Sequence, residues 1–423
     1  MSARRNTRIF VLWILIFLIQ NPLRNYLPVI EYADELFPIF GLAVFCSRKR
    51  TKLFRTPKAA RRYILPFAVF FFACIMGNII YRYQSVGLVL LDAYTNFKFF
   101  GTLIAALIIF ERSDYWYDTK KISKVVNSIS TILFSLLVID FLFKVFPADG
   151  ERFGLRPEQL IYTLPTYLVG AVVFLLSLQL MFFRNNNVKY IIMNLITMSL
   201  TLRSKALAAV IVFCIIYWVV QIRKKKFKVW HLVVIGIVGI FIAWSQIRFY
   251  YIELSGASAR SLLTITSVKI AKDYFPIGTG FASFASHAAS MNYSPVYYKY
   301  GLNNFWELSN ANPSGYFDDT FWPIILGQGG LLGIVSYLFL LVRLFITNIK
   351  IRKYNKHLYA MVLFVFSYLL ISSTSEPSFN NSIAIPLAMV LGYSWAQLKR
   401  VKSVGDIGMS IISQMEPNRR ELI

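Results

Sequence analysis

Arginines in short polar connectors are the residues of this sequence whose type and position best suit chemistry on an anionic group. Arg152 and Arg156 lie in ERFGLRPEQ, Arg203 lies in the TLRSK turn, and Arg260 opens ARSLLTITS. A guanidinium directs two donors at one anionic group, so arginines that converge could hold a phosphate or diphosphate. Lys205, in the same turn as Arg203, is expected to join substrate binding. The alternative is that each arginine reaches lipid headgroups or pairs with a nearby acid.

Carboxylates and one histidine could transfer protons. Asp318 and Asp319 form the one adjacent pair of aspartates, and we predict that one of them takes a proton from a hydroxyl, with His287 and Glu307 as alternatives. His287 and Asp273 are also predicted to contact substrate. Adjacent carboxylates could instead hold Mg²⁺ or favour the positive end of the following helix. We expect no metal and no cofactor, because the histidines are scattered at 231, 287 and 357 and no CxxC or HxxxH spacing occurs.

Many of these groups belong to one long polar excursion, residues 248–317, with the acidic pair directly after it. Long loops between apolar segments are more often functional or disordered than idle. This stretch is therefore predicted to form the lid and part of the active site of an integral-membrane enzyme. Within it, Pro276, Gly278 and Gly280 predict a turn that lets backbone approach another segment closely. Glycines in LGQGGLLG, further on, predict close helix packing.

Composition places the chain in a membrane. Of its 423 residues 57% are hydrophobic and 15% are charged, and apolar runs of about 20 residues recur from end to end. The runs do not alternate with period two, so they predict helices rather than barrel strands. The net charge of +25 lies mainly in short connectors, as the positive-inside rule describes for cytoplasmic loops. This placement indicates membrane topology and not a nucleic-acid binding site. We predict one membrane domain over residues 1–423 with no nucleic-acid partner.

The pattern predicts an all-α polytopic protein with about twelve spans, both ends in the cytoplasm and residues 248–317 outside. A basic N-terminus without a small-residue cleavage site predicts that the first span is retained. The stretch 81–97 is too apolar for an ordinary loop and is expected to lie in the interface or to re-enter. The predicted spans are 9–25, 29–46, 63–82, 95–110, 126–146, 161–183, 190–202, 206–222, 231–247, 321–346, 358–374 and 382–398.

The order of these motifs resembles a known family. A basic helix in the long loop is followed by aspartate and P-x-G-x-G, then by Asp-Asp before LGQGGLLG. Together with TLRSKALAA and ERFGLRPEQLIYT, these pieces look like the bacterial O-antigen and exopolysaccharide polymerase superfamily (Wzy-type), which also contains the O-antigen ligases. The resemblance covers roughly residues 145–345, and the N-terminal third matches only in hydropathy.

The resemblance implies a bundle of about twelve spans related to the GT-C glycosyltransferases. It implies an enzyme of the bacterial cytoplasmic membrane that joins oligosaccharide repeat units on undecaprenyl diphosphate at the outer face, inverts the anomeric centre and needs no metal. Arg152, Arg203 and Arg260 would contact the diphosphate. A chain-length regulator protein is a partner compatible with this reading.

Two alternatives stay open. Ligases of this superfamily usually carry a histidine where this chain has Asp318 and Asp319, so the acidic pair favours a polymerase over transfer of a finished glycan to another acceptor. A transporter or flippase of lipid-linked sugars should carry paired ionisable groups inside its spans, whereas here polar groups gather in the connectors.

Overall fold

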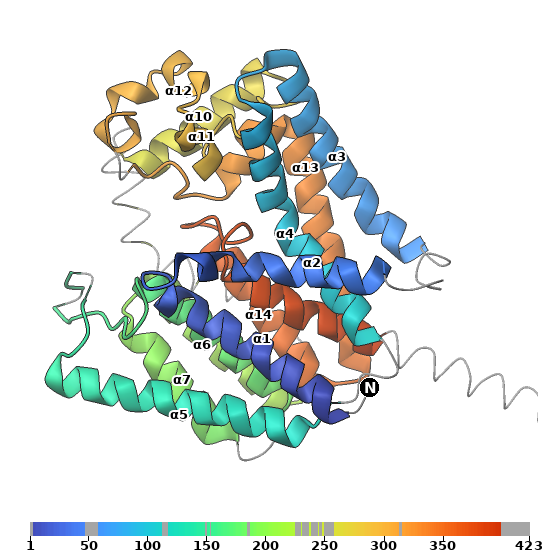
Figure 1. Cartoon of the computed structure of the whole chain (residues 1–423), viewed down its shortest axis with the longest axis vertical. Helices are drawn as coiled ribbons and strands as arrows, with labels where there is room; N and C mark the ends of the chain where they lie inside the picture. Colours follow the sequence, from blue (N-terminus) through green and yellow to red (C-terminus); the bar gives the residue numbers. More distant parts are fainter. Residues whose placement is uncertain are drawn as a thin grey trace, which may run out of the picture.

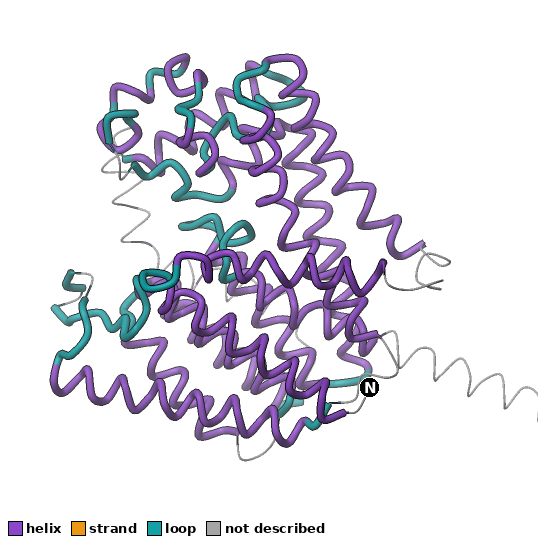
Figure 2. The backbone as a smooth tube through the Cα atoms, in the orientation of Figure 1, coloured by secondary structure: helices purple, strands orange, loops and turns teal. Residues whose placement is uncertain are grey.

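The structure, a computed structural model, describes residues 3–46, 58–111, 117–148, 150–152, 154–183, 187–224, 230, 237, 244, 248, 258–312 and 315–398. Its regular elements in these ranges are helices (Figure 2), with one isolated bridge between Arg152 and Leu155. The longer helices are α1 (Ala3–Leu23), α2 (Ala33–Cys46), α3 (Lys58–Tyr81), α4 (Val86–Glu111), α5 (Thr119–Phe143), α6 (Pro165–Met181), α7 (Val188–Leu200), α8 (Ser204–Tyr217), α10 (Ala259–Asp273), α13 (Trp322–Ile349), α14 (Lys356–Ser372) and a final helix, Ala384–Leu398.

The described residues contain six helices that are long and apolar enough to cross a membrane, which confirms an all-α polytopic membrane protein. Four further apolar helices, α6, α7, α14 and the final helix, have 10–17 residues. At 1.5 Å per residue they reach about 20–26 Å, less than the roughly 30 Å of a bilayer core. Only 28% of the most apolar window of α3 and of α5 is buried, so their outward faces suit contact with lipid. The predicted span 231–247 lies almost wholly outside the described residues.

The arrangement in Figure 1 separates the helices into two groups. Helices α3, α4 and α13 run together, and α10 lies across one end of them with two short helices of the long loop, α11 (His287–Met291) and α12 (Pro295–Lys299). Helices α1, α5, α6 and α7 form the second group, and α14 packs against α6, α8 and α13. The long loop is thus a compact cap on the first group.

Helix α4 begins earlier than the sequence predicted. It runs from Val86 to Glu111, and residues 86–110 form one candidate span, so most of the stretch predicted to lie in the interface or to re-enter belongs to a long apolar helix. Its polar residues Asp92 and Asn96 are buried and hydrogen-bonded: the Asn96 amide donates to the Asp92 carbonyl at 2.9 Å and accepts from Asn380 at 3.2 Å. Satisfied polar groups can sit in a span because their hydrogen bonds offset the loss of water.

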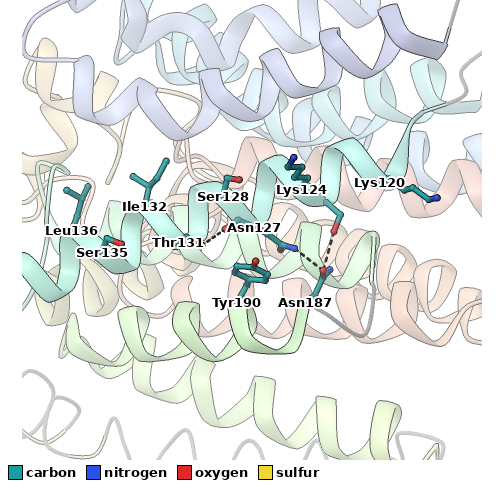
Figure 3. A pocket seen from close by; sticks show the side chains of 11 residues that line it. Lys120, Lys124, Asn127, Ser128, Thr131, Ile132, Ser135, Leu136, Asn187 and Tyr190 are labelled. Atoms are coloured by element: carbon teal, nitrogen blue, oxygen red, sulfur yellow. Dashed lines mark hydrogen bonds between the residues drawn. The ribbon is translucent and has the colours of Figure 1, made fainter.

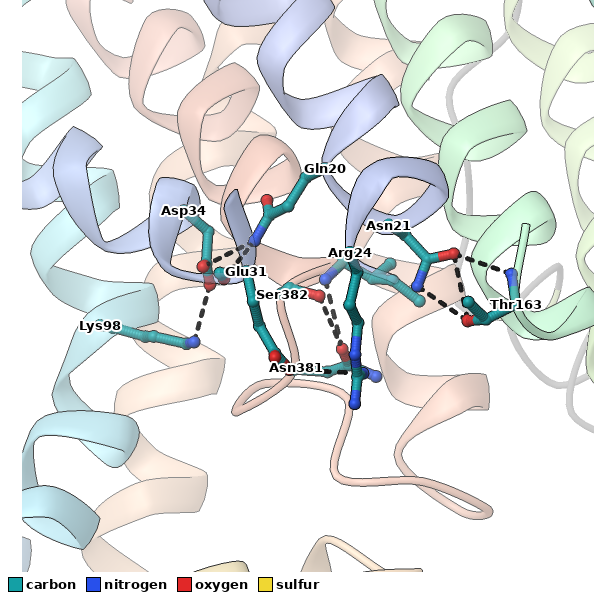
Figure 4. A network of polar contacts seen from close by, with 10 residues as sticks. Gln20, Asn21, Arg24, Glu31, Asp34, Lys98, Thr163, Asn381 and Ser382 are labelled. Atoms are coloured by element: carbon teal, nitrogen blue, oxygen red, sulfur yellow. Dashed lines mark hydrogen bonds and ion pairs between the residues drawn. The ribbon is translucent and has the colours of Figure 1, made fainter. Parts of the chain in front are cut away.

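A buried ion pair joins the first helices to α4. The Lys98 ammonium lies 2.7 Å from the Asp34 carboxylate, which also accepts from the Gln20 amide at 2.9 Å, and the same Gln20 nitrogen donates to the Glu31 carbonyl. Figure 4 shows these side chains meeting where α1 ends and α2 begins, with Asn21 bonded to Thr163 beside them. Removing one partner of such a pair would leave a buried charge without a counter-ion, which is strongly destabilising. The network therefore holds α1, α2 and α4 together.

Helix α13 is broken where the glycine turn of the long loop enters it. Gly330 has φ 62° and ψ −159°, outside helical geometry. The freed backbone groups pair with the turn: Thr279 and Gly280 donate to the carbonyls of Gly327 and Gln328 at 3.0 Å, and Leu332 donates to the carbonyl of Pro276. The close backbone approach predicted for the P-x-G-x-G segment is confirmed. It also explains how a span tolerates non-helical backbone, since these three backbone groups of α13 find partners in the turn.

Gly278 tests this contact. A Cβ there would overlap the backbone of Gly327 and Gln328. We expect Gly278→Ala to destabilise the protein by about 1–3 kcal/mol, as overpacking of rigid backbone does. Gly87→Ala is the matched control, because nothing lies within 4 Å of its Cβ position. Thermal unfolding in detergent measures both, and equal midpoints for the two variants would contradict the proposed fit.

Candidate functional site

The turn between α7 and α8 places two cations at one helix start. Leu202 adopts φ 52° and ends the path of α7, Arg203 has an extended backbone at the N-cap of α8, and Ser204 begins the helix. Lys205 therefore lies in the first turn of α8, one residue beyond Ser204. Both charged side chains are partly buried. A short turn between two apolar helices confines them to one end of the bundle.

Helix α10 presents Arg260 at its own start. Ser258 caps the helix by accepting from the Ser261 amide, and the Glu307 carboxylate accepts from the Ala259 amide at 2.7 Å. A capping hydroxyl and an acid at the positive helix end both stabilise this start. Arg260 then donates through Nε to the Asp319 carboxylate at 2.6 Å. The long loop and the entry to α13 are joined through this pair.

A second ion pair lies beside the first. Lys205 pairs with Glu376, a residue of the connector between α14 and the final helix, and the Ser372 hydroxyl also donates to Glu376. The side chains of Lys205 and Glu376 are 11% and 10% exposed, so the charges are largely withdrawn from water. The charges of Arg203 and Arg260 are close enough to act on Lys205, and that of Lys205 acts on Asp319.

We call these five residues the charge cluster: Arg203, Lys205, Arg260, Asp319 and Glu376. They come from four places far apart in the sequence, and electrostatic interactions or ion pairs link all of them. Three cations face two carboxylates, and the Asp318 carboxylate lies next to them. A partly desolvated group of cations of this kind suits an anion with several oxygens.

Further charges surround the Tyr167 side chain near the start of α6. Arg24, Glu31, Glu376 and Asp318 all lie close enough for their charges to act on its hydroxyl group. Because Glu376 belongs to the charge cluster, this outer group is continuous with it. Arg24 and Glu31 form an ion pair at 3.3 Å (Figure 4), and each side chain is nearly half exposed. Exposed pairs are worth little, so either residue can exchange its partner.

The two adjacent aspartates have different surroundings. Burial raises the pKa of the Asp319 carboxyl, and the Arg260 guanidinium opposes that rise. The Asp319 carboxylate is therefore engaged in its ion pair with Arg260. Asp318 is exposed and makes no hydrogen bond or ion pair with a described residue. Of the two, Asp318 is the carboxylate that can accept a proton from an incoming group without first breaking an ion pair.

Arg152 and Arg156 are held elsewhere in the described structure. Arg156 lies 3.4 Å from the buried Asp140 carboxylate and donates to the Phe146 carbonyl. Arg152 shares two backbone hydrogen bonds with Leu155. No described contact joins either arginine to the charge cluster. Their connector touches the α7–α8 turn through the Glu158 amide, which donates to the Leu200 carbonyl at 2.9 Å.

The predicted substrate contacts Asp273 and His287 belong to other parts of the long loop and have other neighbours. Asp273 ends α10 and accepts from the Tyr300 hydroxyl at 2.7 Å, and thirteen residues of helix put it about 20 Å from Arg260. His287 begins α11 and is exposed, with the buried Asp92 near enough to sense its charge. Asp92 accepts from the Ala282 amide, the Ser286 hydroxyl and the Gln328 amide, so this region anchors the loop.

Arg24 and Glu376 were missed in the sequence. The argument that selected Arg203 applies equally to Arg24, an arginine at the predicted external end of the first predicted span. Glu376 is the one ionisable residue of STSEPSFNNS, in the predicted external hairpin near the end of the sequence. Its meaning depends on Lys205 lying opposite, and no spacing in the sequence indicates that contact.

Comparison with known proteins does not identify a family for this chain. No family model matches the chain, and no curated protein matches it. Among the described residues there is no group of three or more histidine, cysteine, aspartate or glutamate side chains arranged to hold a metal ion.

Glu158, in the connector between α5 and α6, interacts with the carboxyl group of Asp140 in α5, and the protonation of this pair can be tested. Burial and a hydrogen bond with Asp140 raise the pKa of Glu158 from 4.5 to about 8. A carboxyl whose pKa is raised by folding stabilises the native state below its unfolded pKa, and loses that contribution as the pH rises through the folded value. We expect wild-type protein to lose stability between about pH 4.5 and pH 8 relative to Glu158→Gln, whose amide can donate to Asp140 at either pH. The control is Glu151→Gln, an exposed residue of the same connector. Thermal unfolding across this range measures the effect, and parallel curves for wild type and Glu158→Gln would refute it.

Proposed function

We propose that this protein is a membrane glycosyltransferase that polymerises undecaprenyl-diphosphate-linked oligosaccharide repeat units into a surface polysaccharide. The observation that carries the proposal is the meeting of Arg203, Lys205 and Arg260 in one partly buried cluster beside Asp318 and Asp319. The resemblance of the motifs around these residues to the O-antigen and exopolysaccharide polymerases supplies the substrate class. In this proposal the chain has about twelve spans in the bacterial cytoplasmic membrane, and the cluster faces the external side.

The cations would stabilise the leaving group. As the bond from the donor sugar to the diphosphate breaks, negative charge grows on the diphosphate oxygens, and fixed cations stabilise that charge best where water is scarce. Arg260 is held in place by Asp319, so Asp319 is a positioning residue for the guanidinium. Lys205 is held in the same way by Glu376. A bound diphosphate is negatively charged. It would therefore compete with the carboxylates of Asp319 and Glu376 for these cations.

Asp318 is the proposed base. The acceptor is a sugar hydroxyl on a second lipid-linked unit, and its oxygen would form the new bond to the anomeric carbon while its proton passes to the Asp318 carboxylate. The diphosphate departs with the bonding electrons from the opposite face, which inverts the anomeric centre. Holding both lipid-linked ends under the long loop would add the advantage of proximity.

Loss of an arginine tests the leaving-group role. We expect Arg203→Ala and Arg260→Ala each to reduce polymerisation by roughly 100-fold or more, the usual effect of removing a group that stabilises transition-state charge. Arg223→Ala is the matched control, because Arg223 follows the far end of the same helical segment and stacks on Trp218 there. Polymer length is measured with purified protein and lipid-linked repeat units. Long chains made at the wild-type rate by both cluster variants would remove the site assignment.

The two aspartates should separate chemistry from positioning. Asp318→Asn is expected to lower kcat with little change in binding of the lipid-linked substrate, because it removes the proton acceptor alone. Asp319→Asn is expected to weaken substrate binding as well, because Arg260 loses the carboxylate that orients it. The measurement is kcat and KM for each variant together with direct substrate binding. Identical kinetic changes in both variants would contradict the division of roles.

A further inference from the structure

An open groove lies between α5 and α7, lined by none of the residues of the charge cluster. Its volume is about 680 Å³, and its walls include Lys120, Lys124 and Asn127 of α5 and Tyr190 of α7 (Figure 3). Asn187, at the start of α7, forms the floor: it is 1% exposed and accepts from the Ser123 hydroxyl at 3.2 Å and the Asn127 amide at 3.0 Å. These contacts fix the spacing of the two helices, so the groove is a formed feature.

The wall contributed by α5 is polar where a membrane span is normally apolar. Lys124, Ser128, Thr131 and Ser135 recur at helical spacing on one exposed face of a helix that is long and apolar enough to cross a bilayer. Polar side chains that face hydrocarbon alone are disfavoured. A ligand with polar groups along this wall of the groove would form hydrogen bonds with these side chains.

Electrostatics at the entrance selects an anion. Lys120 and Lys124 both line the groove, and no acidic side chain is among the described residues that line it. Neither lysine forms an ion pair with a described residue, whereas Lys121, which does not line the groove, lies 3.5 Å from Asp118. Helices α5 and α7 both begin at this end. The Asp118 carboxylate caps the start of α5, whereas no side chain caps the start of α7, so the positive end of the α7 dipole adds to the two ammonium groups.

We propose that this groove binds the headgroup of an acidic phospholipid. The phosphate would lie between Lys120 and Lys124, and the hydroxyl and amide groups of the wall would bond the glycerol and ester oxygens. An acyl chain would follow α5 past Ile132 and Leu136, about 12–18 Å further along the helix axis. A basic pocket between membrane helices is a known recognition mode for anionic lipid headgroups. The inference does not depend on the proposed glycosyl transfer.

The experiment titrates the intact purified protein in neutral detergent with phosphatidylglycerol or phosphatidylcholine and counts bound lipid by native mass spectrometry. We expect preferential binding of phosphatidylglycerol. The double variant Lys120→Ala/Lys124→Ala should bind it roughly 30-fold more weakly, from about 1 kcal/mol per lysine. Lys121→Ala is the matched control: its side chain is 62% exposed and does not line the groove, so its binding should be unchanged.

Each other outcome would overturn the proposal. Equal binding of the two lipids would mean that the lysines do not select charge, and an equal loss in Lys121→Ala would mean a diffuse surface effect. Displacement of the lipid by inorganic phosphate at equal concentration would assign the site to a free anion. Disulfide formation between two copies of Ser128→Cys in nanodiscs would mean that a second copy of the chain fills the groove.

Discussion

The structure depends on a buried set of hydrogen bonds that fastens the long loop to the membrane helices. The Asp92 carboxylate on α4 accepts from the Ala282 amide, the Ser286 hydroxyl and the Gln328 amide, and the broken backbone of α13 pairs with the glycine turn next to it. Without these partners a carboxylate and several backbone groups would be unsatisfied where water is scarce. Because the loop is anchored here, α10 begins where Arg260 can reach Asp319.

The charge cluster follows the same rule, that charge withdrawn from water requires a partner. Lys205 with Glu376 and Arg260 with Asp319 are stable because each charge has a close counter-ion. Both pairs also hold cations in fixed positions. A site built in this way is organised before an anion binds, and organisation in advance is what makes charge stabilisation effective. Asp318, exposed beside it, is left available for proton transfer.

The charge cluster and the α5–α7 groove both contain cations, but these are arranged differently. The charge cluster draws its cations from two segments, the α7–α8 turn and the start of α10, and pairs them with carboxylates, which orient them. The α5–α7 groove has its two lysines on one helix, with hydroxyls and amides beyond them and no acid among its described lining residues. The first arrangement suits a ligand that must be held in one geometry for reaction. The second suits a ligand that is retained by charge and by contact along its length.

The sequence alone determined the solvent, the class of secondary structure and several local features, because these depend on composition and on residues close together in the chain. Apolar runs specified membrane helices, the glycines of P-x-G-x-G specified a close backbone approach, and ARSLLTITS indicated a helix in the long loop. The tertiary structure decided which charges meet. Arg203, Lys205 and Arg260 converge with Asp319 and Glu376, whereas Arg156 is taken up by Asp140. Spacing along the chain does not encode such contacts, because they depend on how helices distant in sequence pack. For the same reason the burial of Asp92 and Asn96 in α4 does not follow from the sequence, because their hydrogen-bond partners lie far along the chain.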